Sequence, residues 1–176
     1  HHVGQGTKFA ISVSDYFSSM LDQDMKWSDA EKIRKYWDGP FCLKGIMSVE
    51  DAKNAVKIGA SSIMISNHGG RHLDGSRSPF DQLKEILDAV GGKIEVICDG
   101  GIRRGTHILK ALSLGANACS GGRLYLYALA AGGALGVQQS LSNLKNELLR
   151  NMKLLGCKKI SELNVKNLRF RNEKYL

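Results

Sequence analysis

Two polar, glycine-rich stretches of this chain carry residue types that can do chemistry. Residues 66–71 read Ser-Asn-His-Gly-Gly-Arg and place His68 three positions before Arg71, and residues 99–105 read Asp-Gly-Gly-Ile-Arg-Arg-Gly. Histidine is a base poised near neutral pH, and arginine grips a carboxylate through paired hydrogen bonds. The N–H groups of a glycine-rich turn, together with arginines, can seat a phosphate. The two stretches therefore predict a base beside a carboxylate-binding cation, and a phosphate site.

A second glycine–arginine pair and a lysine extend this candidate site. Gly122 and Arg123 follow a further short apolar run, and Lys44 ends an earlier one. Glycine lets the backbone approach an anion closely, so two such loops favour phosphate binding over mere tight turns. Their spacing matches neither a P-loop nor a Rossmann fingerprint. Lys44 could stabilise negative charge on a cofactor ring; the alternative is a lysine with a buried stem and its amine in solvent.

Short apolar runs alternate with amphipathic helical patterns between these residues. We expect strands over residues 41–45, 62–66, 94–98 and 116–120. We expect helices over residues 28–37, opened by a Ser28–Glu31 capping box, then from Ser48 to Gly59, from Ser78 to Gly91 and from Thr106 to Gly115. A long last helix should follow, striped by Val137, Leu141, Leu144, Leu148, Met152 and Leu155.

This alternation predicts an α/β fold with a parallel sheet. Strands joined by single helices must run parallel, because only a crossover returns the chain in the same direction. Lys44, His68, Asp99 and Arg123 all stand at or just beyond the carboxyl ends of predicted strands, where α/β sheets and barrels place their sites. Four βα units are visible, whereas a closed barrel needs eight.

Composition and charge narrow the classes of function. With 43% apolar and 24% charged residues, the 176-residue chain has an ordinary globular composition. Most of the formal charge of +8 lies in residues 141–176, where there are nine Lys/Arg and three Asp/Glu, and aromatic residues are not interleaved with these cations. We therefore expect no nucleic-acid partner. The sequence contains no metal-binding motif, so we expect no metal site.

The cysteines indicate a reducing compartment. Cys42, Cys98, Cys119 and Cys157 have no CxxC spacing, and the first three fall inside or beside predicted strands. We interpret them as reduced, buried thiols. No run approaches the roughly 18 apolar residues that span a bilayer. The expected location is cytoplasmic.

The motifs, taken in order, resemble those of the FMN-dependent α-hydroxy-acid dehydrogenases and oxidases. The resemblance rests on Lys44-Gly45, residues 66–74, residues 99–105 and Gly122-Arg123, and residues 12–16, 37–40 and 154–157 are most similar to the quinone-linked lactate and mandelate dehydrogenase branch. It implies the C-terminal half of a (β/α)8 TIM barrel, with about four parallel βα units. One partial domain would divide into an approach segment (1–27), the βα units (28–136), and a last helix with a tail (137–176).

The resemblance also implies residue roles. His68 would be the catalytic base and Arg71 would bind the substrate carboxylate. Lys44 would lie against the flavin N1/O2 edge, with Ser66 also contacting the flavin. The remaining cofactor-binding residues would hold the FMN ribityl chain and phosphate: Asp99, Gly100, Gly101, Ile102, Arg103, Gly122 and Arg123. His72 and His107 are taken as uninvolved, and His72 stands where the family usually has glutamine.

The expected function is FMN-dependent oxidation of a small L-2-hydroxy acid, of lactate or mandelate type, to the 2-oxo acid, as part of a full-length enzyme. The electron acceptor would be a quinone, oxygen or a cytochrome. The full-length form would be a homo-oligomer, in peripheral contact with the cytoplasmic side of a membrane if it follows the quinone-linked branch. One alternative is a truncated half-barrel that binds FMN or phosphate without turnover. Another is a non-flavin phosphate-binding barrel enzyme, which leaves Lys44, His68 and Arg71 unexplained.

Overall fold

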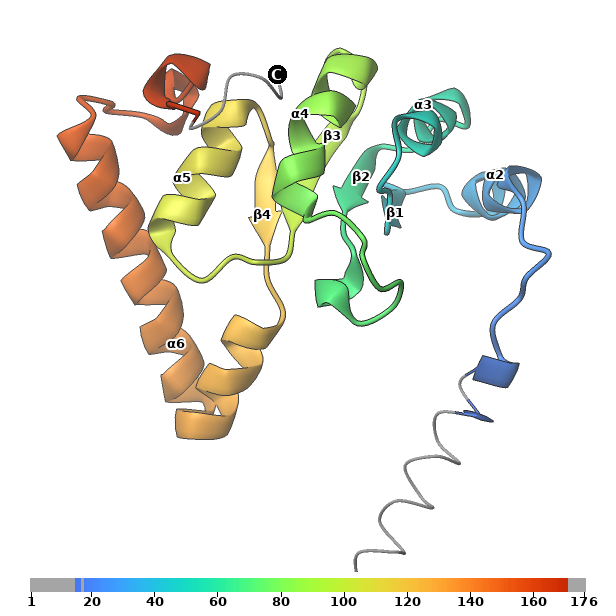
Figure 1. Cartoon of the computed structure of the whole chain (residues 1–176), viewed down its shortest axis with the longest axis horizontal. Coiled ribbons are helices and arrows are strands. Elements are labelled where there is room, and N and C mark those ends of the chain that lie inside the picture. Colours follow the sequence, from blue (N-terminus) through green and yellow to red (C-terminus); the bar gives the residue numbers. More distant parts are fainter. Residues whose placement is uncertain (1–14, 17, 171–176) are drawn as a thin grey trace, which may run out of the picture.

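A four-stranded parallel sheet forms the centre of the computed structural model, which describes residues 15–16 and 18–170. The strands are β1 (Cys42–Lys44), β2 (Ser62–Ile65), β3 (Glu95–Asp99) and β4 (Ala118–Ser120), in that spatial order (Figure 1). Every neighbouring pair is parallel. The predicted parallel βα array is confirmed. Residues 12–14 of the segment compared above, most of the approach segment and the end of the tail (171–176) lie outside the described residues.

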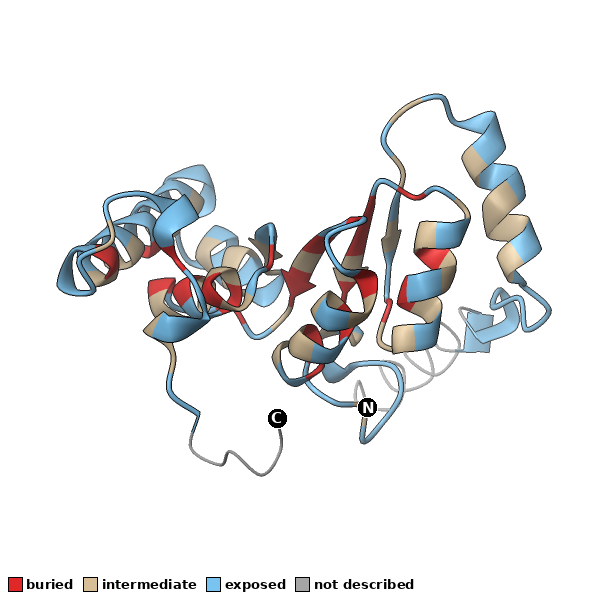
Figure 2. Cartoon of the chain, turned by 90° about the horizontal axis from the view of Figure 1, so that it is seen from above, coloured by how far each residue is buried: buried red, intermediate tan, exposed pale blue. Residues whose placement is uncertain are grey.

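One helix lies in each crossover between neighbouring strands. The helices are α2 (Trp27–Tyr36), α3 (Val49–Lys57), α4 (Pro79–Val90), α5 (Gly105–Leu114) and α6 (Arg123–Leu154), with short 3-10 turns η1 (His68–Gly70), η2 (Ile160–Glu162) and η3 (Val165–Asn167). Helices α3, α4 and α5 pack side by side along one face of the sheet (Figures 1 and 2). The opposite face carries no helix in the described part of the chain.

Local capping explains most of these boundaries. The Ser48 and Ser78 hydroxyls accept hydrogen bonds from Asp51 N and Asp81 N, as predicted for caps of α3 and α4. The predicted Ser28–Glu31 capping box is wrong. Helix α2 begins at Trp27, because the Asp29 carboxylate accepts a hydrogen bond from Lys26 N (3.1 Å) one turn earlier.

The core lies between the helices and the covered face of the sheet. Side chains alternate along a strand, and the buried set on this face is Ile63, Ile65, Val96 and Cys98. They pack against buried residues of α3 and α4, namely Ala52, Ala55, Leu83, Ile86 and Val90. Burying one such large apolar side chain contributes about 1.5–3 kcal/mol. This cluster therefore fixes the register of the strands and, with it, the position of their carboxyl ends.

The other face of the sheet is open. Cys42, Glu95 and Ala118 are exposed there, and Met64 and Ile97 are half-buried. The prediction of a buried thiol is wrong for Cys42, because β1 is an edge strand and Cys42 lies on this open face. On the covered face, burial raises the pKa of Cys98 to about 11 and that of Cys119 to about 12, so both thiols stay neutral.

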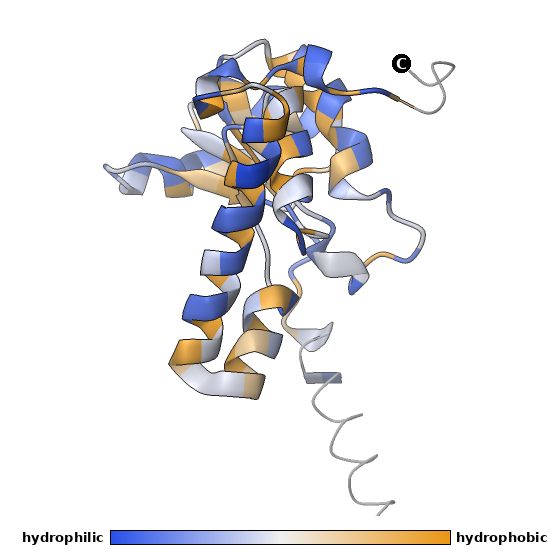
Figure 3. Ribbon diagram, turned by 90° about the vertical axis from the view of Figure 1, so that its left-hand side faces the viewer, coloured by the Kyte–Doolittle hydropathy of each residue, from blue (hydrophilic) through white to orange (hydrophobic). Residues whose placement is uncertain are grey.

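Helix α6 differs from the predicted last helix at its start. It begins at Arg123, directly after β4, and breaks at Gly132 and Gly133 before it continues to Leu154. Of the predicted stripe, Leu144 and Met152 are buried, whereas Leu141 and Leu155 are 46% and 43% exposed. Apolar and polar residues alternate along α6 (Figure 3), and none of the described helices is long and apolar enough to cross a membrane.

Candidate active site

Lys44, Ser66 and Asp99 meet at the carboxyl ends of three neighbouring strands. Lys44 Nζ donates to Asp99 Oδ2 (2.5 Å) and to Ser66 Oγ (2.8 Å), and Ser66 Oγ donates to Asp99 Oδ2 (2.6 Å). Ser66 and Asp99 are buried, at 4% and 9% exposure. The Lys44 side chain is 49% exposed, so its stem is less buried than the sequence suggested. The sheet thus presents one cation, held by a buried carboxylate, to the open face.

Asp99 supplies the negative charge of this cluster. Burial raises the pKa of Asp99, but hydrogen bonds from Lys44, Ser66 and Ser120 outweigh it, and the pKa lies below the ordinary value of 3.8. The carboxylate is therefore ionised at neutral pH and orients Lys44. The resemblance implied that Asp99 helps to hold the cofactor; in the described residues its contacts are with Lys44, Ser66 and Ser120.

The loop that carries His68, which we call the base loop (residues 66–77), is shaped by its own polar side chains. His68 N donates to Ser66 Oγ (3.2 Å), and Gly70 N donates to Asn67 Oδ1 (3.1 Å). His68 adopts φ +56°, a left-handed conformation that is uncommon for a residue with a side chain. Such strain persists only where the surroundings impose it and is concentrated at functional sites.

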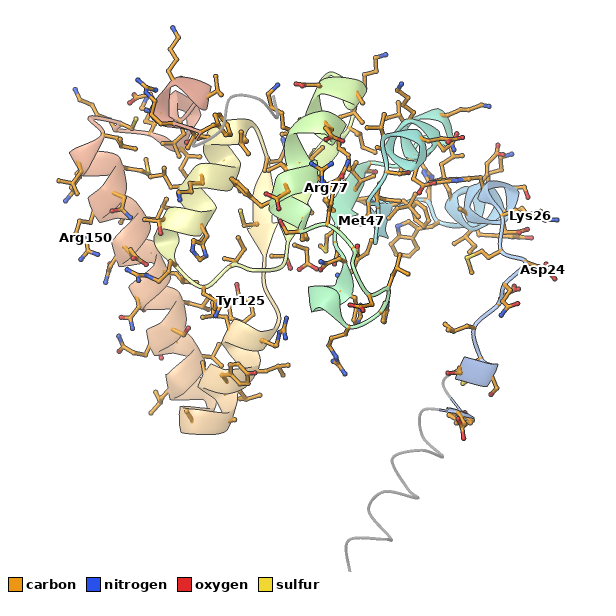
Figure 4. The ribbon with its side chains drawn as sticks, in the orientation of Figure 1. Asp24, Lys26, Met47, Arg77, Tyr125 and Arg150 are labelled. Atoms are coloured by element: carbon orange, nitrogen blue, oxygen red, sulfur yellow. The ribbon has the colours of Figure 1, made fainter. Side chains whose placement is uncertain are left out.

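Arg77, the last residue of the loop, ties it together and joins it to α4. Asn67 Nδ2 donates to the Arg77 carbonyl (3.1 Å), and the Arg77 guanidinium donates to Gln82 Oε1 (2.9 Å) and Glu85 Oε1 (2.7 Å) of α4. Arg77 accordingly lies beside α4 in Figure 4. Asn67 and Arg77 were not predicted to shape the site, because their role depends on a hydrogen bond between residues ten positions apart.

Arg123 joins the base loop to the predicted phosphate site. Its Nη2 donates to the Gly69 carbonyl (2.7 Å), although 54 residues separate the two. A Cβ at Gly69 would lie 3.0 Å from Arg123 Nη2, and Gly69 has φ +70°. The left-handed backbone therefore favours glycine at this position, and the missing side chain leaves room for Arg123.

The ring of His72 stacks on the ring of His68, with centroids 4.0 Å apart and planes at 11°. The pKa of His68 lies below its ordinary value of 6.5; the positive charge of His72 is the largest cause, followed by burial and by the charges of Lys44 and Arg71, with Asp99 opposing them. His72 was predicted to be uninvolved; the structure places its ring in contact with that of the predicted base. Arg71, which directly precedes His72, is exposed and has no ion pair in the described residues.

The predicted phosphate loop (residues 100–104) is open and rich in donors. Gly100 and Gly101 adopt φ +113° and +71°, Ile102 is buried beneath the loop, and Arg103 is exposed. Gly100 N donates to the Ser120 carbonyl (3.1 Å), which places this loop beside the one that contains Gly122. A Cβ at Gly101 or at Gly122 would meet no atom within 4 Å, so space for a ligand is present.

His107, which was predicted to be uninvolved, contacts the backbone of this loop. Its Nδ1 lies 3.0 Å from the Gly101 carbonyl oxygen and 3.3 Å from Arg103 N. One nitrogen thus contacts the backbone of this loop on both sides of Ile102. Its spacing in the sequence, two residues beyond the glycine-rich stretch, was the available signal.

The two arginines of the stretch have separate partners. Arg104 forms an ion pair with Glu147 of α6, through Nη2 and through Nε (2.8 Å), and Gly105 N donates to the other carboxylate oxygen of Glu147 (2.7 Å). Arg104 therefore fastens α5 to α6. Arg103, which has no ion pair in the described residues, remains available for an anion.

This geometry fits a phosphorylated ring cofactor. Arg103, Arg123 and open glycine backbones match an anionic group, and Lys44 stands exposed beside His68 and Arg71 at the same edge of the sheet. Fold and site together define a class: a βα-barrel-type sheet with a histidine, several cations and an open glycine-rich loop gathered at its carboxyl edge.

The chain belongs to the FMN-dependent dehydrogenase family, whose model matches residues 3–170. It is 44% identical over 165 residues to an L-lactate dehydrogenase of Actinobacillus pleuropneumoniae (92% of this chain, 43% of the relative). It is 42% identical over 170 residues to an L-lactate dehydrogenase of Acinetobacter baumannii (93% and 44%). The chain thus spans less than half the length of these relatives.

Two solved structures have the same arrangement of strands and helices. A flavocytochrome b2 variant with pyruvate bound matches with a TM-score of 0.80 and 40% identity, over 83% of this chain and 39% of that one. A mandelate oxidase with benzoyl-formic acid matches with a TM-score of 0.75 and 47% identity, over 78% and 41%. The predicted fold class is confirmed: the four βα units correspond to part of a (β/α)8 barrel.

Proposed function

We propose that this chain provides the base and the phosphate seat of an FMN-dependent enzyme that oxidises a small L-2-hydroxy acid to the 2-oxo acid. The observation that carries the proposal is the contact of Arg123 with Gly69, because it unites the base loop and the phosphate side in one site. The lactate dehydrogenases, flavocytochrome b2 and mandelate oxidase named above support the substrate class.

The positions of the predicted residues are compatible with distinct roles in substrate oxidation and FMN binding. Bound FMN would supply the two-electron acceptor. Arg71 would pair with the substrate carboxylate, and the unprotonated ring nitrogen of His68 would take the proton that leaves the substrate. Lys44, oriented by Asp99, would place a positive charge beside the cofactor ring. Gly100, Gly101, Arg103, Gly122 and Arg123 would hold the ribityl phosphate, and buried Ile102 would anchor their loop.

The electron acceptor, the oligomeric state and the location of the full-length protein are part of the same proposal. We infer an electron acceptor that is a quinone, oxygen or a cytochrome. We also infer a homo-oligomeric full-length protein in the cytoplasm, with peripheral contact to the membrane if the acceptor is a quinone. These features rest on the family resemblance and on the nature of the relatives.

A binding function without turnover is the second candidate. It is favoured by the open face of the sheet and by the His68 ring, to which no carboxylate of the described residues is hydrogen-bonded. A catalytic histidine is usually oriented by such a carboxylate, and its loss weakens the base. The chain would then hold FMN and leave the substrate unchanged.

Titration of the purified chain with FMN, followed by anaerobic addition of L-lactate and then L-mandelate, tests both candidates. Binding quenches flavin fluorescence, and substrate oxidation bleaches the bound flavin. Bleaching that disappears in His68→Gln, while FMN binding persists, is the result that the enzyme function predicts. Binding without bleaching supports the second candidate, and the absence of FMN binding contradicts both.

A further inference from the structure

We propose that His72 is a positioning residue for His68: its ring stacks on the His68 imidazole, fixes the orientation of that ring and, when protonated, repels a second proton from it. The proposal deepens the function above and rests on it in one respect, the role of His68 as the base. The stacking is observed in the base loop and does not depend on that role.

The geometry brings the two rings into direct contact. Their centroids are 4.0 Å apart and their planes are inclined by 11°. His68 and His72 are four residues apart, and the turn that returns the chain begins with His68 at φ +56° and continues through Gly69 and Gly70 at φ +70° and +73°. Three successive left-handed residues make the turn tight enough for the rings to meet.

The backbone around the stack is held at both ends. Ser66 Oγ accepts from His68 N, and Asn67 bridges Gly70 N and the Arg77 carbonyl. Arg123 holds the carbonyl of Gly69 from the other side. No hydrogen bond to the His68 ring is present among the described residues, so the stacked ring of His72 is what restrains it here.

The charges that face His68 come from several elements. Lys44 from β1, Arg71 and His72 from the base loop, and Asp99 from β3 all act on it. Arg123 from α6 reaches the neighbouring Gly69 carbonyl. Lys44 is paired with Asp99, so part of its charge is compensated. His72 contributes the largest lowering of the His68 pKa because it is in ring contact and has no opposing carboxylate partner in the described residues.

A positive charge on the His72 ring lies against the His68 imidazole, with the ring centroids 4.0 Å apart. A proton that binds His68 must overcome the repulsion of that charge. His72 thereby widens the pH range over which an unprotonated His68 can accept a proton, which is the state that a general base requires.

Proton NMR titration of the histidine ring signals tests the proposal on the chain itself. His68→Gln assigns the His68 signal. In His72→Gln, stack and charge are both lost, so the His68 midpoint should move upward and its ring-current shift should disappear. In His72→Phe, the ring remains without the charge, so the midpoint should again move upward while the ring-current shift remains.

His107→Gln is the matched control, because His107 lies at the phosphate loop; it should leave the His68 midpoint unchanged. An unchanged His68 midpoint in both His72 variants, each with the methyl dispersion of the folded core, would overturn the proposal. An upward shift of the same size in His107→Gln would also overturn it. The experiment needs neither FMN nor substrate, so its outcome is separate from that of the FMN titration.

Discussion

The phosphate loop and the base loop lie at the same edge of the sheet but are held in different ways. The phosphate loop leads into α5, whose first residue is bound by Glu147 of α6, and His107 contacts the loop backbone at Gly101 and Arg103. The base loop is held by side chains within itself, among them Arg77, which also contacts α4, and by the guanidinium of Arg123. The phosphate loop is therefore held by helix packing, whereas the base loop depends on a few polar contacts at the surface.

This difference has a consequence for function. A site built by helix packing keeps its shape with or without ligand, because interiors are close-packed and resist deformation. A loop held by exposed polar contacts has a smaller free energy of local opening. In this chain the phosphate loop should keep its conformation under conditions in which the base loop has already opened.

The largest effect should follow from Gly105→Ala on the phosphate side. The added Cβ would lie 2.5 Å from Leu148 N and 2.8 Å from the Leu144 carbonyl oxygen, so α5 and α6 must separate. We expect a loss of about 3 kcal/mol in the free energy of unfolding, the upper range for overpacking, measured by urea unfolding followed by circular dichroism. Gly122→Ala, which adds a methyl group in open space, is the control. Equal midpoints for the two variants would show that the packing of α5 on α6 does not hold the loop.

The second effect concerns the two neighbouring arginines of the phosphate loop. Arg103→Gln should weaken FMN binding at least tenfold, about 1.4 kcal/mol, because a charged hydrogen bond to phosphate is lost. Arg104→Gln should change affinity less and lower the unfolding midpoint instead, because Arg104 binds Glu147. Fluorescence titration with FMN and urea unfolding on both variants measure the two quantities. The reverse assignment would mean that Arg104 is the phosphate ligand.

Gly69→Ala is the corresponding glycine substitution on the base side and should cost less. Its penalty comes from the left-handed backbone, about 1 kcal/mol, since Arg123 Nη2 at 3.0 Å from the new Cβ belongs to a flexible side chain that can move. Urea unfolding measures the penalty, and amide hydrogen exchange should show faster exchange in the base loop but not at Gly105. A loss as large as that of Gly105→Ala would contradict the contrast between the two loops.

The sequence predicts the sheet and the identity of the site better than the contacts that hold the site. The four strands, their parallel direction and the Ser48 and Ser78 caps follow from period and local chemistry, and all were confirmed. The start of α2, the exposure of Cys42 and the break in α6 were missed, because each depends on what surrounds the segment rather than on its own pattern.

The missed residues of the site share one property: their role arises from a contact that spacing does not reveal. Glu147 reaches Gly105 across 42 residues, and Arg123 reaches Gly69 across 54. His72 and His107 lie close in sequence to predicted residues, but their roles depend on the direction of a turn and on the first turn of a helix. Sequence pattern names the residues that carry charge, and tertiary packing determines which of them are already paired.

The smallest effect should be a pH dependence of stability that originates in the base loop. The pKa of folded His68 lies below the value of 6.5 expected when unfolded, so the unfolded chain binds more protons between these two pKa values. Stability should therefore fall slightly as the pH falls below about 6.5 and level off once the pH is below the folded pKa. His72→Gln raises the folded pKa towards 6.5 and should flatten this slope, whereas His107→Gln should leave it in place. Urea midpoints at closely spaced pH values measure the slope; an equal slope in wild type and His72→Gln would show that the two stacked rings are not electrostatically coupled.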